Sequence, residues 1–207
     1  MWGGERRSVS ISTGKERLMS EENRKAIRIS VRNLVEFVLR SGDIDNRRSG
    51  NAQKDAMLAG GRIHRKIQKR MGSGYRAEVP LKHEVQDEEQ EITLLVEGRA
   101  DGIFTENGIL VIDEIKGMYT DISRLEEPIE VHLAQAMCYG YFYCCDKDLD
   151  GIRLQMTYCN LETEEIKRFQ TDRSREELET WFSGVVHEYF KWARYLYHHE
   201  LTRDASI

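Results

Sequence analysis

The spacing of apolar residues changes along the chain between a helical and a strand period, and these changes divide the chain into elements. Apolar residues recur every three or four positions in four segments, which predicts helices at about 31–39, 52–71, 128–145 and 174–199. Runs rich in β-branched residues and bounded by turn residues predict five strands, at 75–85, 91–104, 109–116, 151–160 and 164–171. This order predicts an α/β fold with a central mixed β-sheet and helices on both of its faces.

Single residues refine these helices. Ser30 precedes the first helix and is a good N-cap. Gly60 and Gly61 lie inside the second helix and weaken it by roughly 1 kcal/mol each relative to alanine, which suggests that something approaches the backbone there. For the last helix we expect an inner face formed by Trp181, Val185, Tyr189, Trp192 and Leu196.

The polar segment 1–26 is predicted to be a mobile leader, so that residues 27–207 form a single domain. A chain of 207 residues with 40% hydrophobic and 32% charged residues is long enough for one globular core. No apolar run reaches the ~20 residues of a membrane span, and the N-terminus is not a secretory signal. We therefore expect a cytoplasmic protein without a membrane association.

The net charge of −5 argues against bulk electrostatic attachment to nucleic acid, so any basic surface has to be local. The four cysteines lie at 138, 144, 145 and 159, without the spacing of a zinc site. We expect them to be reduced thiols in the core.

The strand predicted at 109–116 (ILVIDEIK) ends in charged residues, although its first half is apolar on both faces. Alternation places Glu114 and Lys116 on the face of Ile112, while Asp113 points the other way. A carboxylate and an ammonium at the end of a buried strand are costly unless they pair with each other or bind a metal ion. This segment alone leaves both interpretations open.

Asp101 lies on the preceding strand, and a short hairpin brings it toward Glu114. Two converging carboxylates suit Mg²⁺ or Mn²⁺, which prefer oxygen ligands. The alternative interpretation is a turn aspartate, because Asp-Gly is a common hairpin pair. Glu78, on the first predicted strand, is a further candidate ligand, and a bulge would bring in Asp113 instead of Glu114.

His64 lies on the second helix, within a dense basic segment that includes Arg62, Arg65, Lys66 and Lys69. Charge runs are most often solvated faces, but beside a metal site this one is predicted to contact the phosphate backbone of DNA. On the helix that follows Pro128, the side chains of His132, Gln135 and Tyr139 share one face. That stripe is either a set of site residues or ordinary amphipathicity.

Four short motifs occur in a fixed order: His64 on a helix, Gly98-Arg99-Ala100-Asp101 on a strand, Glu114-Ile115-Lys116 on the next strand, and Gln135 with Tyr139 on the following helix. In order and spacing they resemble the PD-(D/E)XK nuclease superfamily, in particular its RecB-like branch, across about residues 62–143. Residues 29–47 also resemble nuclease domains fused ahead of XPD/DinG-like helicases.

This resemblance implies a restriction-endonuclease-like core and a metal-dependent DNA nuclease, with exonuclease action on single-stranded ends in DNA repair or recombination. It implies that Mg²⁺ or Mn²⁺ is bound by His64, Asp101, Glu114 and the carbonyl of Ile115. It makes Asp101, Glu114 and Lys116 the catalytic residues and gives Gln135 and Tyr139 a positioning role. It also implies a helicase domain in a longer chain, although the phosphate-binding pattern GxxxxGK[ST] of a helicase motor does not occur in these residues.

The chain departs from the family pattern at Ala100, where the family name has proline. Some relatives carry an iron–sulfur cluster with one cysteine ahead of the nuclease motifs, whereas Cys138 is the first cysteine here, so we predict no iron–sulfur cluster. Two other functions stay open at this point. One is a DNA-binding or scaffold domain that has lost the reaction, and the other is a hydrolase for a different phosphoester substrate.

Overall fold

The strand-forming runs of the sequence assemble into one six-stranded sheet in the computed structural model, which describes residues 25–39, 50–87 and 92–204 and, within them, the side chains outside 50–57 and 200–204. The strands are β1 (Lys25–Ser30), β2 (Arg76–Gln86), β3 (Ile92–Glu106), β4 (Ile109–Met118), β5 (Gly151–Asn160) and β6 (Ile166–Ser174). The sheet is mixed, because β1 with β3 and β4 with β5 are parallel pairs while the other pairs are antiparallel.

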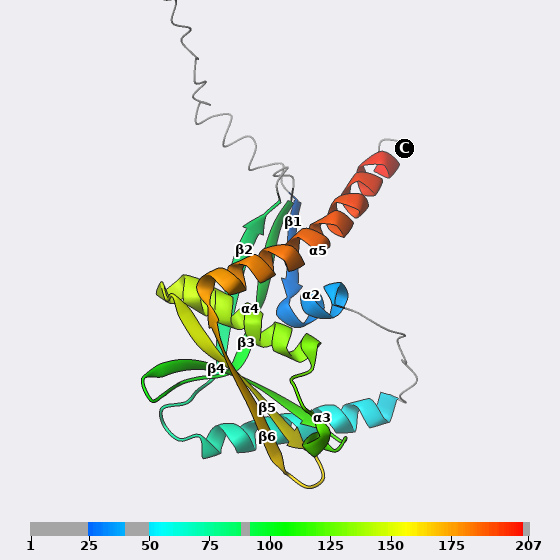
Figure 1. Ribbon diagram of the computed structural model, residues 1–207. Coiled ribbons are helices and arrows are strands. Elements are labelled where there is room, and N and C mark those ends of the chain that lie inside the picture. The colour runs from blue at the N-terminus through cyan, green and yellow to red at the C-terminus, as the bar shows by residue number, and fades with distance from the viewer. Residues whose placement is uncertain (1–24, 40–49, 88–91, 205–207) are drawn as a thin grey trace, which may run out of the picture.

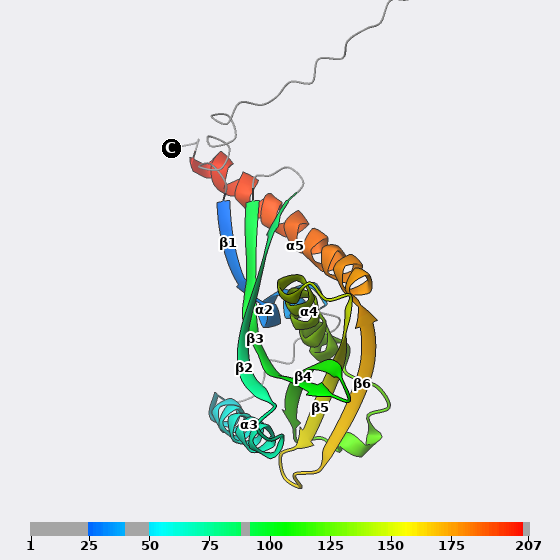
Figure 2. The same ribbon diagram turned by 90° about the vertical axis from the view of Figure 1, so that its left-hand side faces the viewer.

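The helices cover the sheet unequally. They are α2 (Val31–Val38), α3 (Gly50–Arg70), α4 (Glu130–Lys147) and α5 (Arg175–Asp204), with a short 3₁₀ turn, η1, at Ile122–Arg124. Helices α2, α4 and α5 lie on one face, where apolar side chains from sheet and helices form the main core. Of the helices in the described residues, only α3 lies on the other face, across the lower part of the sheet (Figure 2). The expected α/β architecture with helices on both faces is therefore confirmed.

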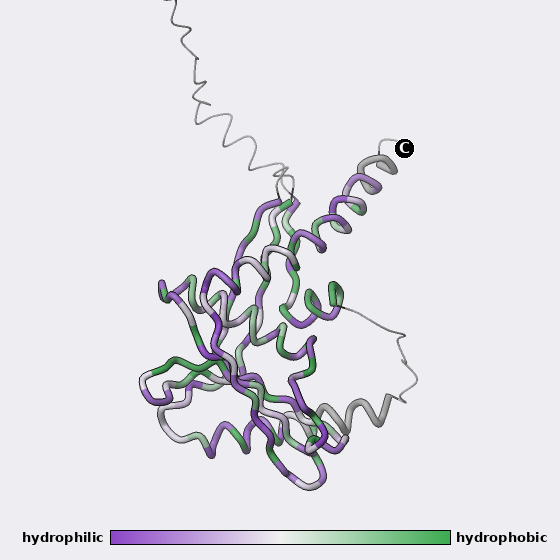
Figure 3. The backbone as a smooth tube through the Cα atoms, viewed as in Figure 1, coloured by the Kyte–Doolittle hydropathy of each residue, from purple (hydrophilic) through white to green (hydrophobic). Residues whose placement is uncertain are grey.

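Local sequence explains where these elements begin and how they pack. The Ser30 hydroxyl accepts a hydrogen bond from the backbone N–H of Asn33 at 3.1 Å, so Ser30 is the N-cap of α2 as predicted. Ile63 and Ile67 of α3 pack with Ile115 and Cys159 in a small second core. Hydrophobic and hydrophilic stretches are interspersed along the strands and helices (Figure 3).

Strand β3 pairs with three other strands, β1, β2 and β4, and this pairing has a gap. On one edge, β2 accompanies it from Thr93 to Ile103. The other edge is shared by two strands, since β1 pairs with Ile92–Glu97 and β4 pairs only with Gly102–Glu106. On that edge the stretch Gly98–Asp101 has no strand partner. Beyond Asp113, strand β4 has lost β3 as a neighbour and pairs with β5 alone.

Three expectations need correction. Strand β1 was not predicted, and it takes the last two residues of the expected leader, Lys25 and Ala26; the rest of 1–26 lies outside the described residues. Among the described residues, only the Arg65 side chain comes within 4 Å of a Cβ built at Gly61 and none does at Gly60, so no described segment of the protein makes the expected close approach to the α3 backbone.

The third correction concerns the inner face of α5. Val185 and Tyr189 are buried as expected, but Trp192 and Leu196 are 41% and 38% exposed. The buried stripe instead includes Leu178, Phe182, Val186, Phe190 and Ala193. The last turns of α5 extend beyond the rest of the structure (Figure 1), so residues after Ala193 have less to pack against.

No helix in the described ranges is long and apolar enough to cross a membrane. All four cysteines are free thiols, and Cys138, Cys144 and Cys159 are buried, as expected for the core.

Candidate metal centre

The gap in the sheet brings Asp101 and β4 together. Where β3 and β4 separate, Oδ2 of Asp101 accepts a hydrogen bond from the backbone N–H of Ile115 at 2.7 Å. Strand β3 provides no partner for this N–H, so the carboxylate oxygen of Asp101 accepts its hydrogen bond instead. In an extended strand the N–H and C=O of one residue point to the same side, so the Ile115 carbonyl is expected to face the same gap.

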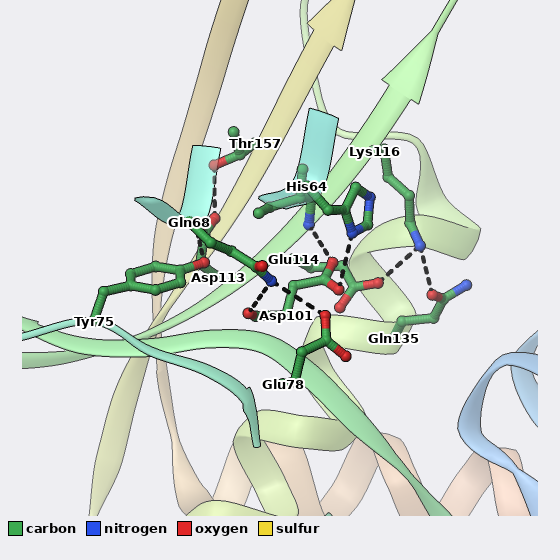
Figure 4. Close-up of polar contacts among 11 residues, drawn as sticks. His64, Gln68, Tyr75, Glu78, Asp101, Asp113, Glu114, Lys116, Gln135 and Thr157 are labelled. Carbon is green, nitrogen blue, oxygen red and sulfur yellow. Dashed lines mark hydrogen bonds and ion pairs between the residues drawn. The ribbon is translucent and has the colours of Figure 1, made fainter. Parts of the chain in front are cut away.

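Helix α3 closes this gap from one side (Figure 4). Nδ1 of His64 lies 3.3 Å from Oδ1 of Asp101, and both side chains are mostly buried. Gln68 follows His64 by one helical turn, and its amide donates to the backbone carbonyl of Asp101 at 3.0 Å and to Oε1 of Glu78 at 3.2 Å. Gln68 therefore ties α3 to both β2 and β3.

Glu78 reaches the centre through an unusual backbone. Its φ of 53° is left-handed, inside strand β2. The flanking residues Ala77 and Val79 pair with Gly102 and Ala100, while Glu78 drops out of the ladder opposite Asp101. A non-glycine residue in this conformation costs of order 1–3 kcal/mol and is frequently found at functional sites. Here the conformation lets the Glu78 carboxylate join Asp101 and His64.

Within the described residues, His64, Glu78 and Asp101 form a group that could hold a metal ion, with one donor atom of each within 4.8 Å of the others. The group contains an imidazole nitrogen and two carboxylates, a donor set that can bind a divalent cation. The structure thus brings two of the predicted ligands, His64 and Asp101, together with Glu78.

Glu114 and Lys116 lie on the α4 side of the gap, at its edge. Nζ of Lys116 donates to Oε1 of Glu114 and to Oε1 of Gln135, both at 2.8 Å. Glu114 is only 4% exposed, and its Oε2 is buried without a hydrogen-bond partner. Buried carboxylate oxygens are rarely left unpaired, so this oxygen suits a ligand that the protein itself does not provide.

The electrostatics of the centre favour a bound cation. Burial raises the pKa of Glu114 above its ordinary 4.5, although the Lys116 ammonium opposes this shift. Burial by itself would lower the pKa of His64, but the hydrogen bond and charge of Asp101 outweigh burial and raise that pKa. Three carboxylates thus surround one lysine and one histidine. A divalent cation would compensate the excess negative charge, and His64 would have to release its proton to bind that cation.

Glu114 does not belong to the group of three close donors, but its charge acts on His64. The residues present therefore fit a cation held by His64, Asp101 and Glu78, while the Glu114 carboxylate would have to move toward this group to join it. Such tightening on binding is common at sites of this kind.

Asp113 belongs to a different environment, as the alternation along β4 predicted. It is fully buried and accepts hydrogen bonds from the hydroxyls of Tyr75 at 2.9 Å and Thr157 at 2.6 Å. The Tyr75 ring lies against Gly102, where a Cβ atom would come within 1.8 Å of it. Gly102 is thus needed for close packing behind the centre.

The last two residues of the predicted site lie on α4. Gln135 holds Lys116, as described above, while Tyr139 is buried against the backbone of β3. A Cβ on Gly98 would lie 2.5 Å from the Tyr139 hydroxyl, so glycine at 98 and tyrosine at 139 are matched in shape. His132, on the same face, is partly buried with Nδ1 unpaired, and burial lowers its pKa to about 4.

The predicted phosphate-binding residues of α3 divide into two kinds. Arg62, Arg65 and Lys69 are exposed. Lys66 instead forms an ion pair with Glu164 in the β5–β6 turn, which leaves it less available to a ligand.

Sequence reasoning assigned no role to Gln68, although its spacing of four from His64 was a usable signal. The sequence predicts Glu78 only as a further candidate ligand, because nothing in the local sequence indicates the left-handed backbone there.

The sequence matches no protein family and no curated protein. Among solved structures, it resembles the protein SSO0001, with a TM-score of 0.49 and 18% identity over 84% of this chain and 81% of that one. It also resembles an alkaline exonuclease (LHK-Exo) from Laribacter hongkongensis, with a TM-score of 0.43 and 13% identity over 84% of this chain and 94% of that one. Similarity at this level is loose.

Proposed function

We propose that this protein is a metal-dependent deoxyribonuclease that hydrolyses phosphodiester bonds, acting as an exonuclease on single-stranded ends in DNA repair or recombination. The observation that carries the proposal is the set of side chains around the gap in the sheet. Asp101 fills the gap, His64 and Glu78 approach it from one side, and Glu114 with Lys116 approaches from the other. The preference for DNA, for ends and for single strands rests on the family resemblance.

Each residue has a role that its contacts support. His64, Asp101, Glu114 and the Ile115 carbonyl would hold Mg²⁺ or Mn²⁺, and Glu78 joins them. When bound, the cation supplies Lewis acidity toward the scissile phosphate and lowers the pKa of a water.

Lys116 provides a positively charged side chain at the site. Its ammonium donates to Glu114 and Gln135, so it is oriented from two sides. Such a group can orient a water by hydrogen bonding and stabilise the charge that develops on the phosphate oxygens. Gln135 then acts as a positioning residue for Lys116, and Tyr139 holds β3 against α4.

The same resemblance carries a second proposal, that a helicase domain follows in a longer chain.

We propose that the DNA backbone is contacted by the exposed basic residues of α3, which are Arg62, Arg65 and Lys69. Lys66 contributes less, because it forms an ion pair with Glu164.

The test is cleavage of end-labelled single- and double-stranded DNA with Mg²⁺, Mn²⁺ or EDTA. We compare the intact protein with Asp101→Asn, Lys116→Ala and, as a matched control, Lys147→Ala on the surface of α4. We expect metal-dependent cleavage that both site substitutions abolish and that the control retains, and product lengths then distinguish end from internal attack. Binding of DNA without cleavage under any metal would replace the proposal by the scaffold function. Turnover of a small phosphodiester but not of DNA would indicate another phosphoester substrate.

A further inference from the structure

Among the described elements, only α3 lies on one face of strands β1, β3 and β2, and most of that face is free of helices (Figure 2). Helices α2, α4 and α5 lie on the opposite face, and α3 crosses only the lower part of the sheet (Figure 2). Alternation along β3 places Glu97, Arg99 and Asp101 on this open face. The pairing of Arg99 with Pro80 and of Glu97 with Lys82 adds those two residues of β2 to the same face.

A groove of about 590 Å³ lies on this face. We call it the β-face groove; its lining includes Pro80, Leu81, Lys82, Glu97, Gly98 and Arg99. It adjoins the metal centre, because Arg99 precedes Asp101 by two residues, a distance of roughly 7 Å along a strand.

The charge of the groove is positive where it meets the centre. Arg28 of β1 forms an ion pair with Glu97 at 3.0 Å, so that carboxylate is already neutralised. Lys82 and Arg99 are exposed and make no ion pair with any other described residue. Helix α3 lies on the same face of the sheet (Figure 2) and carries the exposed Arg65. A polyanion that crosses the centre would therefore meet cations from both the groove and α3.

The arrangement of the two cations suits one strand of nucleic acid. Lys82 lies opposite Glu97 and Arg99 follows Glu97 by two residues, so Lys82 and Arg99 are diagonal neighbours on adjacent strands, roughly 7–8 Å apart. Pro80 and the backbone of Gly98 give the groove an uncharged floor between the two cations. An extended single strand can lay neighbouring phosphates on Lys82 and Arg99 there.

We propose that the β-face groove binds the single-stranded stretch of nucleic acid next to the bond that is cut, with Lys82 and Arg99 on its phosphates. The inference rests on the proposed nuclease function and deepens it, since it assigns the path of the substrate strand.

The experiment measures binding without cleavage, by fluorescence anisotropy of labelled oligothymidine in EDTA over a range of salt concentrations. The variant is Lys82→Gln with Arg99→Gln. The matched control is Lys147→Gln with Lys191→Gln, which removes the same charge from exposed sites on α4 and α5. Each phosphate contact contributes about 0.7 to the salt slope for single strands. We expect the groove variant to lower the magnitude of that slope by about 1.4 and the control to leave it unchanged.

Other outcomes overturn the inference. Equal losses in both variants would mean that net charge, not the groove, attracts the strand. An unchanged slope in the groove variant would place the strand elsewhere, and an equal loss of duplex binding would refute the single-strand preference. Because Lys82 and Arg99 are exposed, the variant should keep the wild-type Tm, and Arg99→Glu serves as a second variant with an expected larger loss.

Cleavage assays on the same proteins separate this inference from the proposed function. If the intact protein cuts DNA but the groove variant binds and cuts like it, the groove assignment alone fails. If the intact protein cuts DNA with none of the metals tested, yet binding depends on Lys82 and Arg99, the nuclease proposal fails and the groove remains as a single-strand binding site.

Discussion

Replacing Glu114 by glutamine distinguishes a metal ligand from a structural ion pair, the two interpretations that the sequence left open. In the structure Glu114 is nearly fully buried, and only one of its carboxylate oxygens has a partner. A charge in that position is unfavourable without a cation. Glutamine keeps the shape of the side chain and can still accept a hydrogen bond from Lys116 through its amide oxygen.

The expected effect on the metal-free protein is small. Losing one member of a buried ion pair usually costs about 3–5 kcal/mol, because the other charge is left without compensation. Lys116 would keep its 2.8 Å hydrogen bond to Gln135 and is 21% exposed to water. Removing the desolvated carboxylate offsets much of the lost attraction, so we expect the free energy of unfolding of Glu114→Gln to change by less than about 1 kcal/mol.

The effect of a bound metal ion on Tm should differ far more between the intact protein and Glu114→Gln. A cation at about 100 times its Kd stabilises a folded protein by about 2.7 kcal/mol. For a chain of this length that raises Tm by roughly 5–10 °C. Differential scanning calorimetry with and without Mn²⁺ should show this rise in the intact protein and in the surface control Glu188→Gln, but little of it in Glu114→Gln.

Two results would refute the reasoning. An equal rise of Tm with Mn²⁺ in Glu114→Gln would exclude Glu114 as a ligand. A loss of about 3 kcal/mol or more in the metal-free variant would show that Glu114 and Lys116 are a structural pair.

Three further predictions follow from the same geometry. Glu78→Asn should keep or raise Tm, because asparagine tolerates a left-handed backbone, while Mn²⁺ affinity by isothermal titration calorimetry falls about 10–100-fold; unchanged affinity would remove Glu78 from the centre. Gly102→Ala should lower the free energy of unfolding by about 2–4 kcal/mol, since its Cβ would meet the Tyr75 ring at 1.8 Å; urea denaturation should show a smaller penalty in a Tyr75→Ala background. Burial, with the neighbouring charge of Lys116, lowers the pKa of His132 from 6.5 to about 4. The unfolded chain then binds the extra proton, so stability is lost as pH falls below 6.5, by on the order of 3 kcal/mol near pH 4, and His132→Phe should flatten that part of the pH–stability curve.

The sequence was informative wherever a local period or motif determines the structure. The β-branched run around Ile112 forms a buried strand because both of its faces are apolar, and alternation along it correctly separated Glu114 from Asp113. Strand β1 escaped prediction because it is short and its partner is distant in sequence: Ile27 pairs with Leu94. A strand of this kind is stabilised by tertiary pairing more than by its own composition.

Register is the part of the site that the sequence could not provide. Glu78 contacts the centre because it drops out of the ladder between Ala77 and Val79, and neither neighbour carries a turn signal such as glycine. The α5 stripe was misjudged for a related reason. A helical period predicts which residues share a face, but whether Trp192 is covered depends on how far the sheet extends beneath the helix.

The gap in the sheet offers a physical reason for an aspartate at position 101. When β4 leaves β3 after Asp113, the backbone N–H of Ile115 loses its strand partner, and an unpaired buried N–H is costly. An asparagine could accept that hydrogen bond as well as Oδ2 of Asp101 does, so backbone pairing alone does not require a charge. The negative charge of Asp101 is explained by His64, 3.3 Å away, and by Glu78, because these three side chains can share a cation. The neutral amide of an asparagine would accept the hydrogen bond from Ile115 equally well but would bind the cation less well. Asp101→Asn should therefore preserve the fold, with a Tm near that of the intact protein, and lose the metal-induced rise. A variant that loses its fold together with its metal response would instead assign Asp101 to the architecture of the sheet.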